Sequence, residues 1–142
     1  MKKCKFFSGK LKITKIPLKT EERGFVVQGL CLKNIKNAHI VSIKKNKIRG
    51  NHFHKKQTET IVIVKGKVQM KFAYNNKVVE MIKDKNTAFV IEIKPEVQHA
   101  FKNLSNEESI LFCFSDKLLR KKCILLLLHQ FDGKYLLRIL SS

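Results

Sequence analysis

The chain has 142 residues, 44% of them hydrophobic, which is enough apolar material for one folded domain but not for two. No apolar run approaches the roughly 18 residues of a transmembrane helix, and the N-terminus has no signal-peptide core, so we expect a cytoplasmic protein without a membrane span. The four cysteines have no Cys-x-x-Cys spacing, which is typical of reduced thiols rather than of a disulfide framework.

The formal net charge of +19 suggests a nucleic-acid partner at first sight, but its distribution argues against one. Arginine occurs at only four positions, and the lysines are spread along the whole chain. Readout of bases relies on arginine forks and stacking aromatic residues, and neither is clustered here. We therefore expect a solvated lysine surface and no specific nucleic-acid partner, with a charge that helps to attract a diphosphate substrate.

Strands and turns dominate the predicted secondary structure. Runs of β-branched and aromatic residues predict strands at 11–16, 25–32, 38–43, 58–64, 68–74, 77–82, 88–93, 97–101 and 109–114. Gly66-Lys67 and Asn75-Asn76 are two-residue connections of the kind that close hairpins, because Gly and Asn tolerate positive φ. Strands this numerous, without long helical patterns, indicate an all-β sandwich or barrel. The leucine-rich residues 118–128 fit either a helix or a further strand.

Two histidines and a glutamate follow the alternation of these strands. His52 and His54 are separated by one residue, so on a strand their imidazoles point to the same face. If a second strand begins at Thr58, Glu59 shares the face of the apolar residue Ile61 and is a carboxylate inside the barrel. A buried carboxylate requires a partner, and a metal ion is the obvious candidate.

A third histidine, His99, alternates in the same sense, with apolar residues two positions away on either side. Three imidazoles and one carboxylate suit Zn, Fe(II), Mn, Ni or Cu and do not choose among them. A single inward histidine is more often a hydrogen-bonded core residue, and this is our interpretation of His39 and His129. Cys113 is expected to be a small buried hydrophobic residue.

Three short motifs carry a resemblance to a known family. They are Glu22-Arg23-Gly24, Arg49-Gly50-Asn51-His52-Phe53-His54 and His99-Ala100-Phe101-Lys102-Asn103. With them, the segment from about residue 21 to 116 resembles the cupin superfamily. It is most similar to the small, RmlC-like cupins of bacterial sugar-nucleotide pathways. These are the deoxysugar 3,5-epimerases, the 3,4-ketoisomerases and the C-terminal metal-binding cupin of capsule-biosynthesis reductases.

The resemblance implies a double-stranded β-helix (jelly-roll) barrel, with residues 1–142 as a single cupin domain and 117–142 as an unassigned extension. It implies an isomerase or epimerase of a nucleotide-linked keto-sugar in polysaccharide or deoxysugar biosynthesis, working as a homodimer. His52 or His54 would remove the proton next to the sugar carbonyl if no metal is bound; otherwise both are metal ligands with Glu59 and His99. Arg49 and Arg23 would bind substrate, although Arg49 also fits a structural ion pair.

The sequence departs from the cupin pattern at its turns. Asn46 and Phe89 stand where the two cupin boxes usually have glycine, and Pro95-Glu96-Val97 lacks the glycine of the usual turn. Two other classes of function remain open, because the fold hosts many functions. They are a non-catalytic ligand-binding or sensory cupin and a metal-dependent oxygenase.

Overall fold

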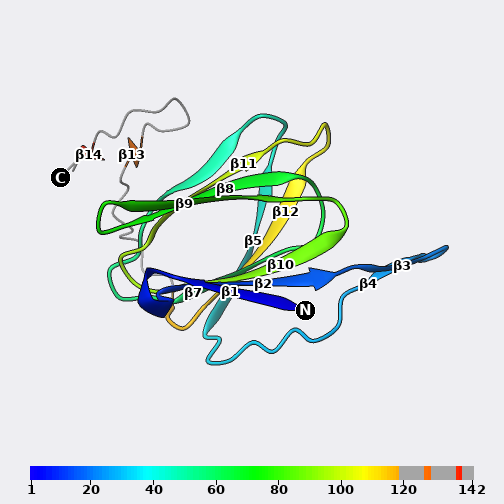
Figure 1. Ribbon diagram of the computed structural model, residues 1–142, viewed down its shortest axis with the longest axis horizontal. Helices are drawn as coiled ribbons and strands as arrows, with labels where there is room; N and C mark the ends of the chain where they lie inside the picture. Colours follow the sequence, from blue (N-terminus) through cyan, green and yellow to red (C-terminus); the bar gives the residue numbers. More distant parts are fainter. Residues whose placement is uncertain (119–126, 129–136, 139–142) are drawn as a thin grey trace.

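The computed structural model of the protein describes residues 1–118, 127–128 and 137–138 (Figure 1). Its strands are β1 Lys2–Phe6, β2 Leu11–Pro17, β3 Lys19–Glu21, β4 Gly24–Val26, β5 Asn37–Ile43, β6 Ile48–His52, β7 Glu59–Ile63, β8 Val68–Tyr74, β9 Lys77–Lys83, β10 Thr87–Ile93, β11 Gln98–Asn103, β12 Ser109–Ser115, β13 Leu127–Leu128 and β14 Leu137–Arg138. One 3-10 turn, Phe7–Gly9, links β1 to β2. No helix among the described residues is long and apolar enough to cross a membrane.

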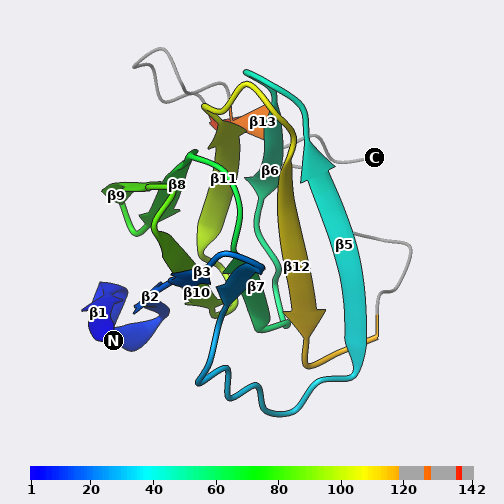
Figure 2. The same cartoon turned by 90° about the vertical axis from the view of Figure 1, so that its right-hand side faces the viewer.

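Two antiparallel sheets form the body of the protein. The larger sheet has the strand order β1-β2-β10-β7-β12-β5, and the smaller one has the order β6-β11-β8-β9. Figure 2 shows the two sheets facing each other, and Figure 1 shows the β3-β4 hairpin extending away from them as a separate small element. This arrangement is the predicted all-β jelly-roll barrel, which confirms the predicted fold class.

The core lies between the two sheets and follows from strand alternation. Side chains at every second position of a strand point inward, and both sheets contribute fully buried apolar residues. Ile13, Ile61 and Ile91 come from the larger sheet, and Met70, Phe72 and Phe101 from the smaller one. The rings of Phe72 and Phe101 meet edge to face at 6.0 Å between centroids, which is a favourable aromatic geometry.

Most predicted strands are confirmed, several to within one or two residues at their ends, and 68–74 coincides with β8. The strand predicted at 25–32 is wrong beyond β4, because this segment pairs only with β3 and leaves Phe25 and Val26 half exposed. Lys2–Phe6, which carried no strand prediction, pairs with β2 as β1. The prediction at 118–128 falls mostly outside the described residues.

One of the two predicted hairpin turns is confirmed. Asn75 and Asn76 have φ of 48° and 59° and join β8 to β9, with Tyr74 opposite Lys77. Gly66-Lys67 does not close a hairpin, because it joins β7 of the larger sheet to β8 of the smaller one.

The turns that depart from the cupin pattern keep a left-handed backbone without glycine. Asn46 has a φ of 59° and Glu96 a φ of 73°. Asn is among the residues that tolerate this region, whereas Glu adopts it at a cost. The Glu96 backbone N–H donates a 2.8 Å hydrogen bond to the carbonyl of His54, so this turn holds the loop that carries His54.

Candidate metal and substrate site

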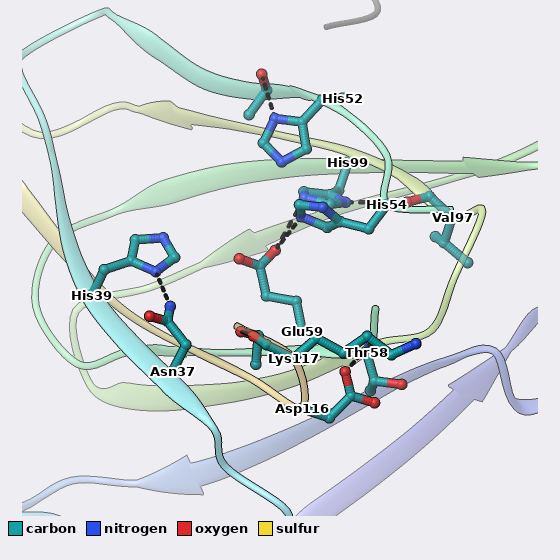
Figure 3. A network of polar contacts seen from close by, with 12 residues as sticks. Asn37, His39, His52, His54, Thr58, Glu59, Val97, His99, Asp116 and Lys117 are labelled. Atoms are coloured by element: carbon teal, nitrogen blue, oxygen red, sulfur yellow. Dashed lines mark hydrogen bonds and ion pairs between the residues drawn. The ribbon is translucent and has the colours of Figure 1, made fainter. Parts of the chain in front are cut away.

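The four predicted ligand residues come from both sheets and meet inside the barrel. His52 ends β6, His54 follows two residues later, Glu59 begins β7, and His99 lies near the start of β11. His52 and His99 are directly opposite each other in the β6–β11 pair. Glu59 reaches them from the larger sheet, so the site spans the interior between the sheets (Figure 3).

A β-bulge in β6 sets the position of His52. The register places His52 opposite His99 and Gly50 opposite Ala100, which leaves Asn51 as an extra residue with a φ of 61°. Gly50 has a φ of +87°, and a Cβ there would lie 2.9 Å from the carbonyl oxygen of His99. Only glycine therefore allows β6 to approach β11 this closely at the level of His99.

The donor atoms of the four residues all lie within 4.8 Å of one another. Glu59 Oε2 is 3.3 Å from His99 Nε2 and 3.5 Å from His54 Nε2. The His52 ring lies 4.7 Å from the His99 ring and 4.8 Å from the His54 ring, measured between centroids. The predicted convergence of these side chains is thus present in the structure.

Hydrogen bonds fix which nitrogen of His99 faces the site. His99 Nδ1 lies 3.1 Å from the carbonyl oxygen of Val97, which can only accept, so Nδ1 carries the proton and donates. A neutral His99 then directs the lone pair of Nε2 at the Glu59 carboxylate, 3.3 Å away. Two acceptors at this distance require a cation between them, which is either a proton on the imidazole or a metal ion.

The nearby carbonyl oxygen of Gly50 orients His52 in the same way, at 3.2 Å from Nδ1. His54 Nε2 is buried and has no hydrogen-bond partner in the part of the chain that the structure describes. An orphaned buried nitrogen directed at a carboxylate is a further sign that a ligand belongs there.

Burial and the neighbouring side chains favour a neutral His52 and an ionised Glu59. Burial lowers the pKa of His52 to about 4, and the neighbouring His99 and His54 lower it further, so this imidazole is neutral at pH 7. Burial alone would raise the pKa of Glu59, but His54 and His99 outweigh it and hold that pKa well below its usual range. A neutral His52 and an ionised Glu59, which is 4% exposed, fit a site for a divalent transition metal.

Comparison with known families finds one family model that matches most of the chain. The family model of the polysaccharide biosynthesis C-terminal domain matches residues 19–123. The chain belongs to this family. No curated protein matches the sequence.

Solved structures share the fold at low sequence identity. The rmlC epimerase of Mycobacterium tuberculosis is 14% identical, with a TM-score of 0.70 over 84% of this chain and 70% of that one. QdtA, a sugar 3,4-ketoisomerase from Thermoanaerobacterium thermosaccharolyticum solved in complex with TDP, is 16% identical, with a TM-score of 0.60 over 77% and 83%. The capsular polysaccharide assembling protein CapF from Staphylococcus aureus is 18% identical, with a TM-score of 0.57 over 75% of this chain but 30% of its own.

The structure does not bring the two predicted substrate-binding arginines to the cluster. Arg23 lies in the turn between β3 and β4, is 91% exposed, and pairs with Glu21 of the same hairpin. Arg49 is exposed on β6, and its Nε donates a 3.3 Å hydrogen bond to the carbonyl oxygen of Ser42 on β5. Their role in binding substrate remains a prediction.

Two further side chains, His39 and Cys113, lie beside the cluster; the sequence predicts both in the core but not that they reach Glu59. His39 lies on the inner face of β5, half-buried, 3.5 Å from the amide nitrogen of Asn37. Cys113, opposite it on β12, is 3% exposed as predicted, and burial raises the pKa of its thiol to about 12. The alternation of His39 with the apolar Val41 is consistent with the predicted inward position of His39, but it contains no signal that His39 lies beside Glu59. His129 lies outside the described residues.

Proposed function

We propose that this protein is a cupin-type isomerase or epimerase that acts on a nucleotide-linked keto-sugar in polysaccharide or deoxysugar biosynthesis. One observation carries the proposal: His99 Nε2 lies 3.3 Å from the buried Glu59 carboxylate, in a cluster that also contains His52 and His54. A polysaccharide-biosynthesis family and a fold shared with a sugar epimerase and a sugar 3,4-ketoisomerase support the choice of substrate class.

We propose that His52, His54, Glu59 and His99 hold one divalent transition metal (Zn, Fe, Mn, Ni or Cu). The bound metal would act as a Lewis acid that polarises the sugar carbonyl. Glu59 contributes the negative charge that balances the cation, and the Val97 carbonyl keeps the His99 ring in the tautomer that a ligand requires.

The reaction requires a base, because a ketone makes the hydrogens on its neighbouring carbons acidic. In the metal-free protein we propose that His52 or His54 accepts that proton, and His52, which is half-buried, is neutral at pH 7. We propose that Arg49 and Arg23 bind the diphosphate from the surface, where their guanidinium groups are exposed.

We propose one domain over residues 1–142, a cytoplasmic location and a homodimer. A second copy would cover an exposed sheet edge such as β5, where Ile40 is 67% exposed.

Exchange of solvent deuterium into 4-keto nucleotide sugars tests this function, because proton abstraction labels the sugar even when net turnover is small. We expect labelling by the wild-type protein and none by His52→Ala or His54→Ala. Glu80→Gln on the exposed part of β9 is the matched control and should label normally. A folded protein that labels no keto-sugar, yet binds a non-sugar ligand at the cluster, would favour a sensory cupin instead.

A further inference from the structure

A second group of donor side chains meets Glu59 from the side opposite His54 and His99. His39 on β5 and Cys113 on β12 are directly paired, and β12 in turn pairs with β7, which begins at Glu59. Ligand atoms of His39, Cys113 and Glu59 all lie within 4.8 Å of one another. Figure 3 shows the Glu59 carboxylate between the His39 ring and the rings of His54 and His99.

This second group shares Glu59 with the first cluster, which consists of His52, His54, Glu59 and His99, but it adds a sulfur donor. Cys113 and Glu59 are 3% and 4% exposed, so neither exchanges freely with water. The contact with Asn37, at 3.5 Å from His39 Nδ1, orients the half-buried His39 ring. Sulfur, imidazole nitrogen and carboxylate oxygen together form a ligand set that favours thiophilic metals, whereas the first cluster has only nitrogen and oxygen donors.

We propose that His39, Cys113 and Glu59 form a second coordination site that takes a thiophilic divalent cation such as zinc or cadmium. On binding, a metal–sulfur bond replaces the S–H bond of Cys113, and the thiol proton passes to solvent. Three protein ligands leave a position open for water. This proposal concerns cation binding alone and does not depend on the sugar chemistry proposed above.

Glu59 connects the two sites. Its Oε2 is the oxygen closest to His54 and His99, and a carboxylate can also use its second oxygen as a ligand. A thiophilic cation beside Cys113 would therefore be coordinated by the same carboxylate that offsets the charge of the metal proposed for the first site.

Cadmium titration of a protein with one remaining thiol tests the proposal. Serine replaces Cys4, Cys31 and Cys123, so any thiolate-to-cadmium charge-transfer band in the ultraviolet comes from Cys113. We expect such a band, and we expect it to remain when His52→Ala and His54→Ala disable the first site. His39→Gln should weaken cadmium binding by roughly tenfold or more.

Two results would overturn the proposal. One is a folded single-thiol protein that shows no thiolate band at saturating cadmium. The other is a His39→Gln variant that binds cadmium as tightly as its parent. Cys113→Ser should abolish the band, and if this buried substitution prevents folding, the titration of His39→Gln decides alone, because His39 is only half-buried.

Discussion

Gly50 is the position where one methyl group should damage both the fold and the site. In Gly50→Ala, the new Cβ would lie 2.9 Å from the carbonyl oxygen of His99 and 3.3 Å from Cα of Ala100, at a φ of +87°. An alanine in the left-handed region costs about 1–2 kcal/mol, of which roughly 0.4–1 kcal/mol returns through the stiffer unfolded chain. Both contacts are to backbone, so β11 must shift, which adds about 1–3 kcal/mol. We expect a total loss of about 1–4.5 kcal/mol.

Gly9→Ala is the matched control, because Gly9 has nearly the same φ, +84°, but nothing within 4 Å of its added Cβ. Urea unfolding should therefore show a loss of only about 0.5–1 kcal/mol for Gly9→Ala. The two variants differ only in the close approach to His99. In Gly50→Ala the added methyl group displaces β11, the strand that carries the proposed ligand His99. Zinc affinity measured by calorimetry should therefore fall in Gly50→Ala and stay unchanged in Gly9→Ala.

Equal losses of stability in the two variants would refute this reasoning, since they would show that β11 makes room for the methyl group at no cost. If Gly50→Ala destabilises the protein but leaves its zinc affinity unchanged, the bulge in β6 does not set the geometry of the metal site.

Three further substitutions test other parts of the structure. Glu96→Asn should raise the free energy of unfolding by about 0.5–1 kcal/mol, because Asn tolerates the left-handed φ better; a loss of stability would show that the exposed Lys10 ion pair matters more. Lys83 is fully buried, and burial lowers its folded-state pKa below the ordinary 10.5, so the unfolded state binds more protons. The stability of wild type relative to Lys83→Met should therefore increase as the pH rises toward 10.5, and parallel pH curves in urea would contradict this. Glu59→Gln should weaken zinc binding by about 10–100-fold in calorimetry, whereas the control Glu92→Gln, whose half-buried carboxylate pairs with Lys12, should not; equal affinity would exclude Glu59 as a ligand.

Local alternation made the core of the site predictable. The spacing of His52 and His54, and the shared face of Glu59 and Ile61, depend only on the two-residue repeat of a strand. The two-residue repeat does not predict how His54 is held. His54 lies beyond the end of β6, and its backbone carbonyl accepts a hydrogen bond from the Glu96 N–H. The bulge at Asn51 likewise has no alternation signal.

Contacts between strands that are far apart in the sequence could not be predicted from it. His39 and Cys113 reach Glu59 only because β12 lies between β5 and β7, and no local pattern specifies that order. The same limit explains Gly66-Lys67, whose glycine indicates a turn but not that the turn crosses between sheets. It also explains Arg23, because the motif that contains it does not reveal that the β3-β4 hairpin stands apart from the cluster.

An anomalous difference map of zinc-loaded crystals, measured across the zinc absorption edge, shows whether the four side chains hold a cation. We expect a peak enclosed by His52, His54, Glu59 and His99, with imidazole nitrogens about 2.0–2.1 Å from it. Zinc found only elsewhere, with His99 Nε2 still about 3.3 Å from the Glu59 carboxylate as it is in this structure, would contradict it. In that case a proton on His99 would be the cation between the two groups.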